Sequence, residues 1–173
     1  MEKTYHIWTN VLYFIAAIYS FIISIQFYVN RKSHIFLAFF IYSILLFLTG
    51  IFSIMYHKHM FTEEEHWSLI DQVFATLTLV YAIVFFIVTI YLRGRLFEEI
   101  FFLCVMFIIL SIVFFALAKV NLQKMLRHNC FIIPKKPVCH KELVNYDIYH
   151  SNWHIYSAMA ILFLLTYIKK RLV

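Results

Sequence analysis

The chain has 173 residues, of which 64% are hydrophobic and only 14% are charged, with a formal charge of +6. A soluble domain has about 45–50% apolar and about 25% charged residues, so the composition excludes an ordinary soluble domain. The basic residues lie beside apolar segments rather than on a separate basic face, which argues against a nucleic-acid partner. The apolar runs are long and continuous, unlike the short alternating strands of a membrane β-barrel. We therefore predict an all-α, polytopic transmembrane helix bundle that forms one integral membrane domain over residues 1–173.

Five apolar segments approach the length needed to cross a bilayer, whose apolar core of about 30 Å requires roughly 20 helical residues. They lie near residues 7–29, 35–56, 69–92, 97–118 and 150–168. The first segment is too long for a signal peptide and no small-residue cleavage site follows it, so we expect it to be retained. The last segment is the shortest, and a polar loop over residues 119–149 is expected to precede it.

Polar residues stand at the ends of three of these segments. The second segment ends with Ser53 and His57, the third begins with Asp71, and the last begins with His150 and His154. A spacing of four residues places both members of a pair on one helix face. With five spans, all of these residues lie at the same membrane face. Because ionisable groups inside a bilayer are costly, they indicate a functional site.

The residue types indicate a catalytic zinc centre. His57, His150 and His154 supply three neutral imidazole ligands, and catalytic zinc sites combine three protein ligands with an open position. Zinc at such a site makes hydroxide available at neutral pH. Asp71 is placed to accept a proton and pass it to a leaving group, and Ser53 to donate a hydrogen bond to a polarised carbonyl oxygen or to water.

Each residue also has an ordinary structural interpretation. Asp71 is one turn into its segment, where the helix dipole favours a negative charge, and Ser53 alone is a common interhelical hydrogen-bond donor. Trp67, Tyr149 and Trp153 fit an aromatic belt at the membrane interface. The remaining histidines fit interfacial positions: His6, His34, His59, His66, His128 and His140.

The distribution of charge and cysteine suggests an orientation. The short connections and the C-terminus carry closely packed basic residues: Arg31, Lys32, Arg93, Arg95, Lys169, Lys170 and Arg171. The positive-inside rule therefore places the C-terminus in the cytosol and the polar site on the lumenal or extracellular side. Cys130 and Cys139 share one polar segment, so they are expected to form a disulfide if that side is oxidising, and to remain free thiols if it is cytosolic.

Three blocks of the sequence resemble the CREST superfamily of integral membrane zinc hydrolases, which includes alkaline ceramidases, adiponectin-receptor-like proteins and GPI-lipid remodelling proteins. The blocks are FSIMYH over residues 52–57, LID over 69–71 and HSNWHI over 150–155. The last block is the most specific, because a histidine pair enclosing a tryptophan opens the final span in ceramidase-like and remodelling proteins. The resemblance covers residues 35–92 and 147–173, and it implies seven spans, whereas five are predicted here.

This resemblance implies zinc ligands at His57, His150 and His154, with Asp71 and Ser53 beside them. The expected function is a zinc-dependent intramembrane hydrolase of a lipid amide or acyl ester, acting on a membrane lipid. The alternative is a non-enzymatic receptor or remodelling protein that retains a structural metal site, which would require a fourth protein ligand such as His59 or His66. Haem ligation by the histidines is a further alternative, although it gives no role to Ser53 or Asp71.

Overall fold

The structure, a computed structural model, describes residues 4–30, 32–59, 66–93, 99–128, 130 and 137–172. The described part of the chain folds into five α-helices and contains no strand, which confirms the all-α prediction. The helices are α1 (Thr4–Val29), α2 (Ser33–His59), α3 (His66–Arg93), α4 (Glu99–Arg127) and α5 (Pro137–Leu172).

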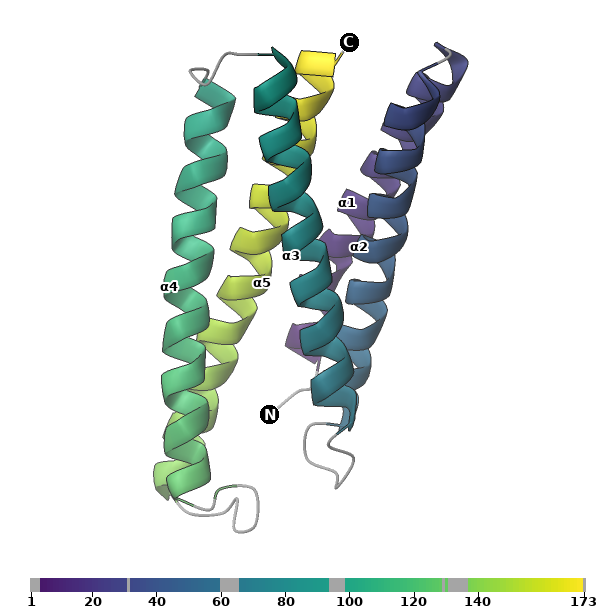
Figure 1. The fold of residues 1–173 in the computed structure, drawn as a ribbon. Coiled ribbons are helices and arrows are strands. Elements are labelled where there is room, and N and C mark those ends of the chain that lie inside the picture. The colour runs from purple at the N-terminus through teal and green to yellow at the C-terminus, as the bar shows by residue number, and fades with distance from the viewer. Residues whose placement is uncertain are drawn as a thin grey trace.

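The helices form two groups that meet along α5 (Figure 1). One group is the antiparallel pair of α1 and α2, with α3 packed on α2. The other is the hairpin of α4 and α5. Helix α5 also contacts α1 and α3, whereas α4 contacts no described helix other than α5. Helices α3 and α4 therefore follow one another in the chain without packing together.

The core lies between α1, α2 and the C-terminal half of α5, and aromatic side chains fill much of it. Phe27 and Phe39 stack with ring centroids 5.5 Å apart, and Tyr42 stacks on Tyr81 at 5.4 Å. Offset aromatic packing of this kind adds specific contact energy to the dispersion forces that hold membrane helices together. The Lys32 ammonium donates a hydrogen bond of 2.7 Å to the Leu172 carbonyl, so the turn after α1 is fixed to the end of α5.

Four of the described helices are long and apolar enough to cross a membrane, over Thr9–Val29, His34–Lys58, Leu69–Tyr91 and Ile100–Arg127. The chain is an integral membrane protein. Helix α5 is not among the four, although we predicted a span over 150–168. Its polar residues at 150–154 lower its hydropathy, and its place between the two groups gives it protein neighbours instead of lipid on several sides.

The connection between α4 and α5 is shorter than the polar loop expected over 119–149. Helix α4 continues to Arg127 and α5 begins at Pro137, a residue type favoured in the first turn of a helix. No glycine or proline interrupts residues 119–127, so the helix extends beyond its apolar part. Cys130 and Cys139 form a disulfide across this connection, with Cα atoms 5.2 Å apart, and both are buried against Tyr146 and neighbouring apolar residues.

Figure 1 shows that the end of α2, the start of α3, the end of α4 and the start of α5 lie at one end of the bundle, and that the end of α5 lies at the other. The end of α2, the start of α3 and the N-terminal half of α5 therefore come together. This is the arrangement on which the predicted site depends.

Candidate metal centre

The three predicted histidine ligands converge on one point. His57 comes from α2, and His150 and His154 come from successive turns of α5. Their Nε2 atoms are separated by 2.8 Å between His150 and His154, 3.1 Å between His57 and His150, and 3.5 Å between His57 and His154. All three side chains are buried, with 2–7% of their surface exposed. Among the described residues they form a group able to hold a metal ion.

The spacing of the nitrogens fits a tetrahedral ion. Zinc binds imidazole nitrogen at about 2.0–2.1 Å, and a tetrahedral angle then separates neighbouring ligand nitrogens by about 3.3–3.4 Å. The three observed separations fall on both sides of this value. Three nitrogen donors and no sulfur suit zinc and several other first-row divalent ions. This buried set of imidazoles pointed at one another could therefore hold a divalent metal ion.

The centre joins the two groups of helices. In the described part of the chain the backbones of α2 and α5 do not approach closely, so side chains bridge the space between them. The His57 ring meets His150 edge to face, with centroids 4.7 Å apart. Beside it, the Tyr56 hydroxyl lies 3.4 Å from the Tyr146 hydroxyl. Burial raises the pKa of Tyr146 well above its ordinary value, so this phenol is neutral and can donate.

Both residues predicted to assist the metal lie at the centre. The Ser53 hydroxyl is buried and 3.5 Å from His154 Nε2. Ser53 also hydrogen-bonds the carboxyl group of Asp71, which is buried at the start of α3. Ser53 thus connects the histidine cluster to the carboxylate, as expected for a group that positions the proton acceptor. The structure brings together all five residues proposed from the sequence.

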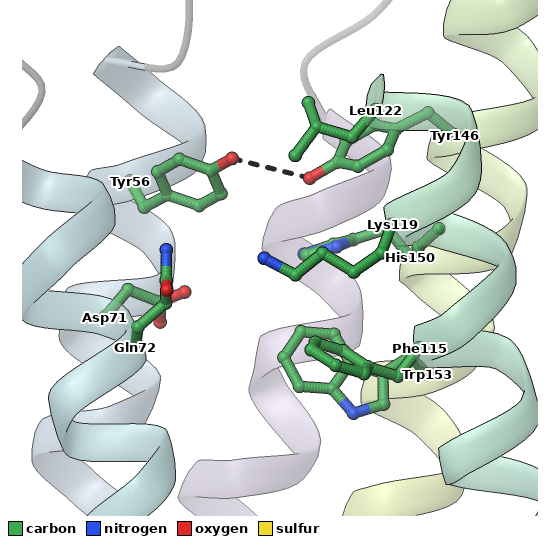
Figure 2. Close-up of a pocket in the computed structure, with 10 residues that line it drawn as sticks. Tyr56, Asp71, Gln72, Phe115, Lys119, Leu122, Tyr146, His150 and Trp153 are labelled. Atoms are coloured by element: carbon green, nitrogen blue, oxygen red, sulfur yellow. Dashed lines mark hydrogen bonds between the residues drawn. The ribbon is translucent and has the colours of Figure 1, made fainter. Parts of the chain in front are cut away.

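A cavity of about 50 Å³ opens beside the centre (Figure 2). Asp71, Gln72 and Tyr56 line one side, from α3 and α2. The other side comes from α4 and α5 and includes Phe115, Ala118, Lys119, Leu122, Tyr146, His150 and Trp153. The volume is enough for a few water molecules. Because α3 and α4 do not pack together, the cavity lies at the gap in the bundle wall between them.

Several residues around the centre were not identified from the sequence. Trp153 was predicted to anchor the chain at the membrane interface. Its ring is half-buried, and its ring centroid is 5.0 Å from the ring centroids of both His150 and Phe115. Tyr13 of α1 meets His154 edge to face at 5.7 Å and hydrogen-bonds Ser157 at 2.5 Å. The contact of Trp153 with His150 follows from their spacing of three residues on α5. The contacts of Trp153 with Phe115 and of Tyr13 with His154 join different helices, and no local spacing signals them.

The other histidines fall in two classes. His34, His128 and His140 are exposed, in keeping with the interfacial positions predicted for them. The side chains of His6, His59 and His66 lie outside the described residues. No family model matches the chain, and it has no match among characterised proteins or solved structures. The assignment of the centre therefore depends on its own geometry.

Proposed function

We propose that the chain is a zinc-dependent intramembrane hydrolase that cleaves a lipid amide or acyl ester. The observation that carries the proposal is the combination at one point of three convergent imidazoles, a buried carboxylate and a serine hydroxyl. The cavity beside them opens between two membrane helices, which suits a substrate that arrives from the bilayer. The alternative is a structural site, which would require a fourth protein ligand beside the three described histidines.

His57, His150 and His154 would hold the ion. Zinc bound there would act as a Lewis acid on a carbonyl oxygen and make hydroxide available at neutral pH. Hydrolysis adds the OH of water to the acyl carbon and breaks the bond from that carbon to the leaving oxygen or nitrogen. The remaining proton of the water must reach the leaving atom.

Asp71 is the residue placed to carry that proton. Its carboxyl group lines the cavity and is next to the histidine cluster, so it can accept a proton on one side and release it to the leaving atom. The Ser53 hydroxyl donates its one proton to the Asp71 carboxylate, and once Asp71 has taken up a proton the hydroxyl would be able to turn and donate to the developing oxyanion. Trp153 and Phe115 line the cavity with aromatic surface.

The orientation belongs to the same proposal. The disulfide between Cys130 and Cys139 favours an oxidising compartment for the end of the bundle that carries the centre. The basic residues in the last turn of α5 favour a cytosolic C-terminus. Both features support our proposal that the centre faces the lumenal or extracellular side.

The test is hydrolysis by the purified full-length chain in detergent micelles, loaded with zinc, against a ceramide and a diacyl phospholipid. Mass spectrometry should detect released fatty acid from one of the two. His150→Ala should abolish release, and His140→Ala, an exposed position on the same helix, should leave it unchanged. Zinc-loaded protein that releases fatty acid from neither lipid would refute the hydrolase.

A further inference from the structure

A lysine, Lys119, stands where the apolar part of α4 ends and its more polar final turns begin. Lys119 precedes Arg127, the last residue of the helix, by roughly two turns, a rise of about 12 Å. It falls inside the apolar stretch Ile100–Arg127. Ionisable side chains in such positions are rare because of their desolvation cost, and they usually face a polar cavity or a pathway. Lys119 therefore requires an explanation that the metal centre does not supply.

Lys119 faces the cavity rather than the end of the helix. Figure 2 shows its side chain reaching across the gap toward the side formed by Asp71 and Gln72. Its ammonium group is 5.4 Å from the centre of the Phe115 ring and acts electrostatically on Asp71. No described residue forms an ion pair or a hydrogen bond with it. Lys124, by contrast, is exposed in the last turn of α4, where a lysine reaches the interface directly.

We infer that Lys119 binds the phosphate group of the lipid substrate, and that this substrate is an acyl ester of an anionic glycerophospholipid rather than a neutral ceramide. The inference rests on the proposed hydrolase function and names its substrate class. Lysine is a common point-charge ligand for phosphate. In a glycerophospholipid a short run of covalent bonds separates the phosphate from an acyl ester. Lys119 and His150 line the same side of the cavity, which must widen beyond its 50 Å³ to admit both groups.

The polarity of the surroundings favours an anion over a neutral headgroup. The wall around Lys119 is largely apolar, with Phe115, Ala118 and Leu122 from its own helix. In such an environment an ammonium is attracted strongly to an opposite charge, because little water screens the pair. A ceramide supplies hydroxyl groups and no charge, so it would give the Lys119 ammonium no anionic partner besides Asp71.

Binding is tested first, with a dialkyl ether analogue of phosphatidic acid that the enzyme cannot hydrolyse. Its apparent Kd for the zinc-loaded full chain is measured by thermal-shift titration in detergent micelles. Lys119→Met should weaken binding about tenfold or more, the scale of one lost hydrogen bond to a charged group. Lys119→Arg and the exposed control Lys124→Met should bind within about threefold of the wild type. Dialkylglycerol, which lacks the phosphate, should bind equally to the wild type and to Lys119→Met.

Two outcomes of this titration would overturn the inference. If Lys119→Met and Lys124→Met weaken binding equally, the attraction comes from general surface charge. If inorganic phosphate alone shifts the thermal unfolding of the wild type as much as the lipid analogue does, the site binds free phosphate and does not define a lipid substrate.

Hydrolysis distinguishes this inference from the proposed function. The wild type should cleave phosphatidic acid faster than diacylglycerol with the same acyl chains, and Lys119→Met should remove that preference while retaining cleavage of diacylglycerol. Cleavage of ceramide or diacylglycerol as fast as phosphatidic acid would overturn the inference and leave the hydrolase standing. Binding of the ether analogue that depends on Lys119, without hydrolysis of any lipid, would support the headgroup site and refute the hydrolase.

Discussion

Replacing His57 by alanine is expected to disconnect the two groups of helices when metal is present. His57 is the one ligand contributed by the α1–α2–α3 group, while His150 and His154 both come from α5. A metal that binds only the folded state adds about 2.7 kcal/mol of stability at a free concentration 100 times its Kd, and about 4.1 kcal/mol at 1,000 times. For a chain of this length each kcal/mol corresponds to about 2–4 °C in Tm. Zinc should therefore raise the Tm of the wild type by about 5–16 °C.

The assay is thermal unfolding in detergent, followed by tryptophan fluorescence, with and without a chelator. His57→Ala should lose the zinc-dependent rise in Tm, because two imidazoles on one helix no longer link that helix to α2. In chelator, the Tm of His57→Ala should differ less from that of the wild type than it does in zinc. The difference that remains in chelator measures the cost of the cavity left by the ring, and the additional difference in zinc measures the loss of metal binding. His140→Ala provides the control and should keep the full rise. An unchanged zinc effect in His57→Ala would refute the assignment of this ligand.

Three further predictions address the neighbouring groups. Asp71→Asn should retain zinc while turnover falls by about 10²–10⁴-fold, since the amide cannot accept the proton; equal loss of zinc in metal analysis would make Asp71 a ligand instead. Ser53→Ala should also retain zinc and lose up to about 10²–10³-fold in kcat, the scale of one oxyanion donor, and unaltered kinetics would exclude that role. Alkylation of unreduced protein from native membranes should leave Cys130 and Cys139 unlabelled in mass spectrometry, and Cys130→Ser should lower stability by about 2–3 kcal/mol for a bond that closes nine residues. Labelling of both thiols would move the centre to the cytosolic face.

The histidine centre could be predicted because its information is local. Four-residue spacing fixes which side chains share a helix face, and alternation of span direction fixes which ends meet. Those two rules predict that His57, Asp71 and His150 lie at the same end of the bundle, and the structure brings these residues together there. The disulfide between Cys130 and Cys139 was likewise indicated by their shared polar segment.

The surroundings of the centre could not be predicted in the same way. Lys119 was assigned to a loop, and Trp153 was assigned to the membrane interface. The positions of both residues depend on how far α4 and α5 continue beyond their apolar parts, which the sequence pattern does not show. Helical turns with polar residues are stabilised by tertiary neighbours, which hydropathy does not report. The contact of Tyr13 with His154 depends on the packing of α1 against α5, and no pattern within either segment specifies that pairing.

The most direct test of the central claim is X-ray absorption at the zinc edge on the purified full-length chain. We predict one zinc per chain, with three imidazole nitrogens at about 2.0–2.1 Å and one light-atom ligand from solvent. His150→Ala should remove the signal. Absence of stoichiometric zinc, or a closed shell of four protein ligands, would contradict a catalytic centre formed by His57, His150 and His154.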